Sequence, residues 1–203
     1  TGVQTCALPI FIDEALCGAG TGLQAADVVI CSVYPAATLD FVKSAVPFLK
    51  SDVLITDATG IKGSLPEDVQ RPLTGRMEFI AGHPMAGRQG SGFGMSQAEI
   101  FDGANYIVVP AAFNSSGAIE WLSSFAGAIG CGQVVQVDAV EHDRIIAYTS
   151  NLPHALAVAL INSASYNENT KYFIAGSFRD GTRVADINPY LWSDLFLANR
   201  ENV

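Results

Sequence analysis

Short runs of apolar residues alternate with longer segments of helical periodicity along the first two thirds of the chain. The runs are nearly continuous, as in residues 27–33 (DVVICSV), which is typical of strands in a parallel sheet covered on both faces. In the longer segments, apolar residues recur every three or four positions, as they do over residues 39–49. This order predicts βαβ units and a doubly wound, mostly parallel sheet. We expect its strands at residues 27–33, 53–56, 79–81, 106–109 and 134–137.

Polar residues and glycines mark the ends of two helices between these strands. Thr38 precedes the apolar positions of residues 39–49, and its side chain is suited to accept from the first free backbone amides as an N-cap. Either Ser115 or Ser116 can cap the next helix in the same way. Gly130 and Gly132 are expected to end that helix.

The pattern changes after residue 138. Residues 139–165 keep helical spacing, and Pro153 is expected to kink or split that helix. Residues 178–203 indicate one or two further helices, and Pro189 is suited to begin the last one. We therefore expect an α/β domain over residues 11–137 and an all-α domain over residues 138–203.

The α/β region lacks the usual opening of a nucleotide-binding domain. Such domains begin with a strand, a GxGxxG turn and a helix that hold a pyrophosphate, and an acidic residue follows about 20 positions later. Neither precedes residue 27, so we expect residues 11–137 to be the C-terminal part of a Rossmann-like domain without its first βαβ unit. Residues 1–10 (TGVQTCALPI) match one translated frame of a common sequencing adapter and are expected to lie outside the fold.

The charge balance argues against nucleic acid as a partner. The chain has 11 Lys and Arg against 20 Asp and Glu, for a net charge of -9, whereas binding to a phosphate backbone depends on dense cationic side chains. An anionic small substrate stays compatible with this charge, because one or two local cations suffice to bind it.

Cysteine spacing and hydropathy indicate a reduced, cytoplasmic protein. The four cysteines form no CxxC pair and no metal-ligand pattern with histidine, so we expect no metal site. No segment reaches the ~20 apolar residues of a membrane-spanning helix, and no basic region of a signal peptide begins the chain. We expect no membrane partner.

His83 is the leading candidate for proton chemistry. It lies in residues 82–87 (GHPMAG) directly after a short strand, where open α/β sheets bind ligands. A histidine with an ordinary pKa of about 6.5 can accept a proton at neutral pH. The alternative is a structural histidine held by backbone groups in a turn.

The other two histidines lie on the long helical segment. His142 is flanked by charged residues in residues 141–144 (EHDR), which favours a solvated helix face. His154 follows Pro153, whose missing N–H frees a backbone carbonyl. That position is compatible with either a ligand site or a satisfied core histidine.

Two arginines flank a carboxylate in residues 179–183 (RDGTR). A guanidinium is suited to bidentate capture of a carboxylate, so this segment is a candidate anion site. The alternative is an ion pair between Asp180 and Arg183 across one helical turn.

Four motifs, in order and at suitable spacing, resemble those of prephenate dehydrogenases. The resemblance covers nearly all of residues 27–203. The motifs are residues 57–62 (DATGIK), 82–87 (GHPMAG), 141–154 (EHDR leading to LPH) and 178–185 (FRDGTRVA).

The resemblance implies an NAD- or NADP-dependent oxidoreductase of tyrosine biosynthesis. Members of this family oxidise prephenate with loss of its ring carboxylate and release 4-hydroxyphenylpyruvate, carbon dioxide and NAD(P)H; some take arogenate and give tyrosine. Such enzymes are homodimers when complete. Because the phosphate-binding turn is missing, we expect the chain by itself to be inactive.

The same resemblance implies roles for individual residues. His83 would accept the proton of the substrate hydroxyl, and Arg183 would bind a substrate carboxylate with Asp180 orienting it. Lys62 is a second candidate cation near the ring carboxylate or the nicotinamide. The remaining expected contacts are His154 and Trp192 lining the substrate pocket, and Ser32, Val33, Tyr34, Pro35 and Asp57 along the cofactor.

Three positions depart from the family pattern, and one of them, Asn151, is frequently His in relatives. Many relatives carry Ser where Gly60 stands, and Thr59 would replace that hydroxyl only if the turn shifts. Many also carry Glu where this chain has Gln89, near the substrate. These departures leave open a second hypothesis, a non-catalytic relative that binds an aromatic acid.

Overall fold

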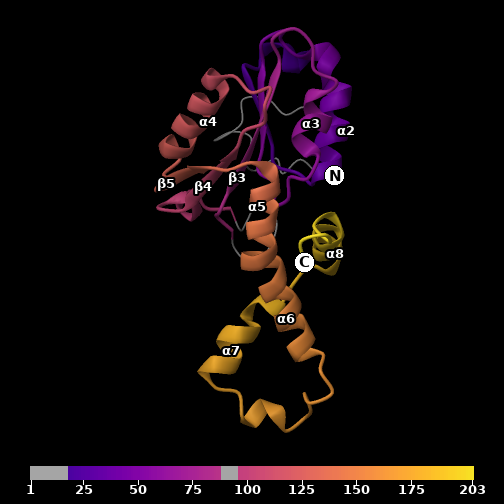
Figure 1. Ribbon diagram of the computed structural model, residues 1–203, viewed down its shortest axis with the longest axis vertical. Helices are drawn as coiled ribbons and strands as arrows, with labels where there is room; N and C mark the ends of the chain where they lie inside the picture. The colour runs from indigo at the N-terminus through magenta and orange to yellow at the C-terminus, as the bar shows by residue number, and fades with distance from the viewer. Residues whose placement is uncertain (1–17, 88–95) are drawn as a thin grey trace. The chain divides into compact units, whose positions relative to one another are not determined.

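The computed structural model describes residues 18–87 and 96–203. The chain divides into two compact units, Thr1–Ala139 and Val140–Val203, which we call the sheet unit and the helical unit. Figure 1 labels helices and strands of both units, and each unit is described by itself below.

The sheet unit is built on one five-stranded sheet whose strands lie in chain order among the described residues. Strands β1, β2 and β3 are parallel, β4 runs antiparallel to β3, and β5 is parallel to β4. The strands are β1 (Val28–Cys31), β2 (Leu54–Asp57), β3 (Glu78–Pro84), β4 (Asn105–Val109) and β5 (Gln133–Gln136).

All five expected strands are therefore present, and the mostly parallel sheet is confirmed. The reversal between β3 and β4 was not expected from the sequence. An apolar run carries no information on strand direction, and an antiparallel neighbour needs no crossover helix.

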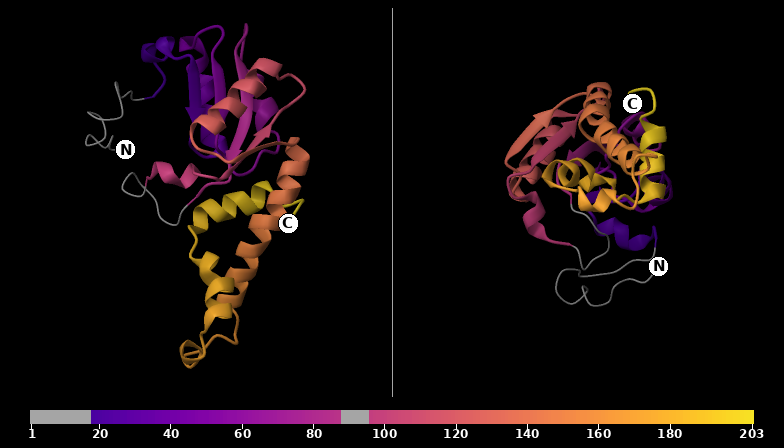
Figure 2. Two further views of the ribbon diagram at one scale, coloured as in Figure 1. Left: turned by 90° about the vertical axis from the view of Figure 1, so that its left-hand side faces the viewer. Right: turned by 90° about the horizontal axis from the view of Figure 1, so that it is seen from below.

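Helices cover both faces of the sheet. Helices α2 (Pro35–Ala45) and α3 (Leu65–Gln70) pack on one face, and α4 (Ser116–Ala128) lies across the strands on the other (Figures 1 and 2). Side chains of β3 alternate between the two cores: Phe79 packs on the α2 and α3 side, and Ile80 packs on the α4 side. This three-layer arrangement is that of a doubly wound domain.

Helix α2 begins earlier than its sequence pattern indicated. Its N-cap is Tyr34, with Pro35 at the first helical position, and Thr38 is a buried residue within the helix. The expectation that Thr38 caps the helix is wrong, because a proline is already suited to the first turn of a helix. Ser115 does cap α4, accepting from the Ala118 amide at 3.2 Å.

Short 3₁₀ segments complete the sheet unit. They are Thr21–Ala25 before β1, Val46–Phe48 after α2 and Ala98–Phe101 before β4. Gly130, with φ +100°, follows α4 and takes a conformation that a residue with a side chain rarely adopts.

The helical unit contains no strand in residues 140–203. Its first long helix runs as α5 (Ala139–Ile146), a π-helical turn (Ala147–Asn151) and α6 (Leu152–Ile161). The π turn ends at Asn151, two residues before Pro153, so the expected break is confirmed. The other elements are Thr170–Tyr172 (3₁₀), α7 (Gly176–Thr182), Arg183–Ala185 (3₁₀) and α8 (Pro189–Ala198).

The fold class expected from the sequence is thus confirmed, with an α/β unit followed by an all-α unit. In the part of the chain that the structure describes, no helix is both long enough and apolar enough to cross a membrane.

Candidate active site

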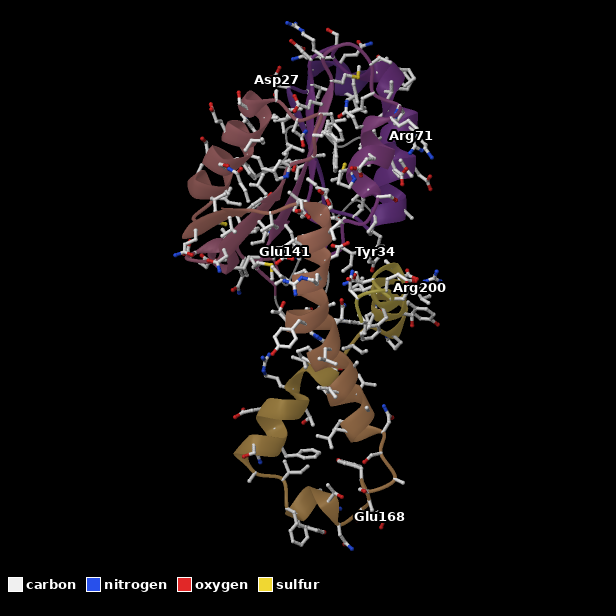
Figure 3. All side chains as sticks on the ribbon, in the orientation of Figure 1. Asp27, Tyr34, Arg71, Glu141, Glu168 and Arg200 are labelled. Carbon is white, nitrogen blue, oxygen red and sulfur yellow. The ribbon has the colours of Figure 1, made fainter. Side chains whose placement is uncertain are left out.

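The carboxyl ends of β1, β2 and β3 meet at one edge of the sheet. Residues 32–35 follow β1, residues 57–62 begin at the last residue of β2, and His83 lies near the end of β3. Figure 3 labels Asp27, which precedes β1, and Tyr34, which follows it, at opposite ends of the sheet unit. Ligands of open α/β sheets bind outside this edge, so these segments form the candidate site.

Asp57 is fully buried and accepts hydrogen bonds on both carboxylate oxygens. Its Oδ2 accepts from the Thr59 amide at 3.0 Å, from the Lys62 Nζ at 2.7 Å and from the Thr59 hydroxyl. Its Oδ1 accepts from the Gly82 amide at 3.1 Å. Through these bonds the Asp57 side chain ties the end of β2 to β3.

Lys62 is buried beside Asp57. Its Nζ donates to the Gly82 carbonyl at 2.6 Å and to the Thr59 hydroxyl at 3.3 Å, in addition to Asp57. Its side chain is 0% exposed. Direct contact with a substrate carboxylate would therefore require this ion pair to open.

Gly82 is enclosed on its remaining side by Tyr106. A Cβ at position 82 would lie 2.5 Å from the Tyr106 hydroxyl and 3.0 Å from a ring carbon, so no side chain fits there. Burial raises the pKa of the Tyr106 hydroxyl well above its usual range, and the nearby Asp57 charge raises it further.

His83 follows Gly82 directly and is half-buried at the sheet edge. It pairs with Ile107 of β4 in the strand register. A Cβ at Gly60 would lie 3.8 Å from both the Cε1 and the Nε2 of His83, so residue 60 faces the imidazole at ordinary contact distance. The structure thus brings Asp57, Thr59, Gly60, Lys62 and His83 together.

The segment after β1 offers exposed apolar surface at the same edge. Val33 is 51% exposed and Tyr34 is 54% exposed, and Ser32 is also exposed. Cys31, one residue earlier, is buried, and burial followed by the Asp57 charge raises the pKa of its thiol to about 11. Cys31 is therefore an inert thiol at neutral pH.

In the helical unit, the structure stacks His154 on Trp192. The two ring centroids lie 3.6 Å apart with planes at 26°. His154 Nδ1 lies 2.8 Å from the Ser150 carbonyl oxygen, which can only accept, so Nδ1 carries the proton. In the neutral ring, Nε2 is then an acceptor.

His142 does not lie on a solvated helix face, and that expectation is wrong. It is buried, and its Nδ1 lies 2.6 Å from the Asp143 Oδ1. The charged neighbours that favoured exposure, Glu141 and Arg144, pair with each other on the outside of the helix at 2.7 Å. The buried side of α5 carries His142, Asp143 and Ile146.

Sequence reasoning missed two buried amides of the helical unit. Asn199 Nδ2 donates to the Asp143 carbonyl and to the Asn151 Oδ1, both at 2.9 Å. These bonds join α5, the π turn and the end of α8. A lone Asn in a helical pattern gives no signal of such a contact, because the partners lie 48 and 56 positions away.

The arginine segment ends one helix and begins another. Asp180 lies in α7, Arg183 begins the following 3₁₀ segment, and both residues are exposed. Gln89 lies outside the described residues. The structure thus places Asp180 and Arg183 on the surface of the helical unit and does not describe Gln89.

Comparison with known proteins gives the family. Residues 13–135 match the nucleotide-binding domain of prephenate dehydrogenase, and residues 138–203 match the prephenate dehydrogenase dimerization domain. The chain belongs to the prephenate dehydrogenase family.

Curated relatives in this family include a prephenate dehydrogenase of Bacillus subtilis and a cyclohexadienyl dehydrogenase of Zymomonas mobilis. The first is 30% identical over 184 residues, covering 89% of this chain and 49% of the relative. The second is 35% identical over 183 residues, covering 87% of this chain and 61% of the relative. The chain thus spans about half of the first relative and about three fifths of the second.

A solved prephenate dehydrogenase has the same fold over nearly the whole chain. The enzyme from A. aeolicus, in complex with hydroxyphenyl propionate and NAD+, matches with a TM-score of 0.85 and 29% identity. The match covers 98% of this chain and 71% of that one. A Synechocystis arogenate dehydrogenase, at 24% identity and a TM-score of 0.76, shares the fold.

Proposed function

We propose that the protein carrying this chain oxidises prephenate with NAD(P)+ to 4-hydroxyphenylpyruvate and carbon dioxide, a step of tyrosine biosynthesis. The observation that carries the proposal is the half-buried His83, held at the carboxyl edge of three parallel strands with Gly60 against its ring. The A. aeolicus relative, which binds NAD+ and an aromatic acid, supports this assignment.

The residues of the edge fit a dinucleotide. Val33 and Tyr34 offer exposed surface after β1, and Gly60 places no side chain against the His83 ring. When bound, NAD(P)+ supplies the acceptor for the hydride of the carbon that bears the substrate hydroxyl.

His83 then acts as the general base of the reaction. As hydride leaves the ring carbon, the hydroxyl oxygen becomes a carbonyl and its proton passes to the imidazole. Loss of the ring carboxylate follows, driven by formation of the aromatic ring. Asp57 lies deeper than the ring, bonded to Gly82, so we assign it to the support of the site and not to contact with cofactor.

Residues of the helical unit are proposed to bind the rest of the substrate. Arg183 is an exposed guanidinium suited to a substrate carboxylate, with Asp180 orienting it. Trp192 fixes the His154 ring by stacking, which leaves Nε2 free to accept from a substrate hydroxyl or from water.

The complete protein is proposed to be a homodimer through this unit. Its α5 and α6 region carries exposed apolar side chains, with Val140 at 78%, Tyr148 at 76% and Leu156 at 61% exposure. Large apolar side chains exposed along one long helix are candidates for burial in a protein interface. The match to a dimerization domain supports the same role.

The direct test is to express the protein encoded by the longest reading frame that contains these residues and to measure its turnover. Formation of the reduced cofactor is followed with prephenate and with arogenate, each with NAD+ and NADP+. We expect turnover with at least one substrate, and the rates decide between prephenate and arogenate. Absence of turnover in all four combinations would refute the proposal.

One observation favours a second candidate, a relative that binds an aromatic acid without oxidising it. Position 60, which faces the imidazole, carries no hydroxyl in this chain. Titration calorimetry separates the two functions, because only the enzyme is expected to bind NAD(P)+ as well as the aromatic acid.

A further inference from the structure

Strand β3 continues beyond the end of its neighbour β2. Backbone pairing between them ends at Thr56 and Ile80, whereas β3 runs on to Pro84. Alternate residues of β3 point their backbone groups toward β2, as the bond from the Glu78 amide to the Val53 carbonyl shows. Glu78, Ile80 and Gly82 are the positions of β3 that face β2 in this way. At Gly82 the backbone of β2 no longer supplies a partner.

Two side chains take the place of the missing strand. Asp57 Oδ1 accepts from the Gly82 amide at 3.1 Å, and Lys62 Nζ donates to the Gly82 carbonyl at 2.6 Å. The two side chains are themselves joined at 2.7 Å, and both are fully buried. Charge-assisted bonds inside a protein are shorter and stronger than neutral ones, so they hold this residue firmly.

The third side of Gly82 is closed by the Tyr106 ring, which leaves no room for a Cβ. The residue is thus fixed through its amide, its carbonyl and its α-carbon. His83 is attached directly to it, so the direction in which the imidazole leaves the strand depends on this arrangement.

The same short segment also bounds the imidazole. Gly60 lies between Asp57 and Lys62 in sequence, and its α-carbon faces the Cε1 and Nε2 of His83. Residues 57–62 therefore hold the part of β3 that carries His83, and they also lie against the His83 ring.

We propose that Asp57 and Lys62 are positioning residues, whose ion pair holds Gly82 and thereby sets the place of the His83 ring. In this role Lys62 acts through the Gly82 carbonyl and does not bind substrate. The inference rests on the proposed function of His83 as the base. A proton transfer depends steeply on the distance between donor and acceptor, and a displacement of about 1 Å can cost ~100-fold in rate.

The test is Lys62→Met in the longest reading frame that encodes the chain, because methionine keeps most of the length and removes the donor. We expect kcat for prephenate to fall about 10- to 100-fold while KM changes less than about threefold. A rise in KM of tenfold or more with kcat retained would identify Lys62 as a substrate cation and overturn the proposal. A lower melting temperature with parental kcat would also overturn it, since that result marks a purely structural pair.

Lys50→Met is the matched control. Lys50 also bonds an aspartate of the sheet unit, Asp27, but this pair is partly exposed. Asp27 precedes β1 and Lys50 precedes β2, so the pair lies at the end of these strands opposite to His83. We expect parental kcat and KM for this variant, and a loss equal to that of Lys62→Met would contradict a specific effect.

A double variant covers the case in which Lys62→Met fails to fold. Asp57→Asn with Lys62→Met removes both charges together, which avoids an unpaired buried carboxylate. We expect the folded double variant to keep a kcat at least tenfold below the parent. Parental kcat in this variant would overturn the proposal.

Hydrogen exchange separates this inference from the proposed function. Exchange at the Gly82 amide needs no turnover, and Asp57→Asn is expected to accelerate it by tenfold or more relative to buried amides of β4. Unchanged exchange would overturn the positioning role. Faster exchange in a protein without dehydrogenase activity would support the positioning role of Asp57 and Lys62. It would refute only the proposed dehydrogenase function.

Discussion

At the scale of single residues, the site depends on two glycines that face different neighbours. A Cβ at Gly82 would meet the Tyr106 hydroxyl at 2.5 Å, whereas a Cβ at Gly60 would meet His83 at 3.8 Å. The sequence singled out His83 from its place after a strand and Gly60 from the family pattern. It gave no signal for Gly82, because its need for a bare α-carbon comes from a tyrosine on another strand.

The two glycines give a matched pair of variants for stability. Gly82→Ala is expected to lower the free energy of unfolding by about 1–3 kcal/mol, because the buried Tyr106 must move to admit the methyl group. Gly60→Ala is expected to change it by less than about 1 kcal/mol, since the new contact is at ordinary distance. Urea unfolding of both variants measures the difference, and equal losses would contradict the packing described.

The Cys31 thiol gives a prediction for pH. Burial raises its pKa from 9.0 to about 11, so at pH 8 the folded chain holds about 100-fold less thiolate than the unfolded chain. Alkylation by iodoacetamide, read by mass spectrometry, should be at least 100-fold slower at Cys31 in the folded chain than in urea. Equal rates would show that the thiol is not buried.

The sign of the linked effect on stability follows from the same shift. The folded pKa lies above the unfolded one, so the contribution of Cys31 is fully present below pH 9 and is lost as pH rises through 11. Cys31 should therefore make stability fall as the pH rises from 9 to 11, and it should cause no pH dependence near neutrality.

At the scale of secondary structure, apolar patterning predicted the five strands of the described residues and the break at Pro153. It did not predict the direction of β4 or the start of α2, because both depend on tertiary connections and not on local periodicity. The buried side of α5 was also missed. Glu141 and Arg144 made the segment look solvated, although their ion pair occupies only its outer side.

The buried amides of the helical unit give a prediction at this scale. Asn199→Ala removes the donor that bonds both the Asp143 carbonyl and the Asn151 side chain inside the unit, so it should cost about 2–4 kcal/mol of unfolding free energy. Asn162→Ala is the control, because Asn162 is exposed and bonds only within its own helix. A loss below about 1 kcal/mol for Asn199→Ala would contradict the network.

At the scale of the whole molecule, the order of four motifs carried more information than any single feature. Each motif alone fits a structural role, and Lys62 and His142 do lie in buried pairs in the structure. Apolar patterning predicted the two fold types, and the order of the motifs predicted the family. The sequence did not distinguish residues expected to contact substrate from residues that position their neighbours. That distinction depends on burial and on hydrogen-bond partners, which only the structure shows.

The most direct test of the account is the effect of His83→Asn on catalysis and on binding. The amide keeps a polar group of similar size but cannot take up a proton at neutral pH. We predict that kcat falls by about 10²- to 10⁴-fold while the dissociation constant of prephenate changes less than about threefold. Retention of kcat, or equal losses in kcat and in binding, would contradict the role of His83 as the catalytic base.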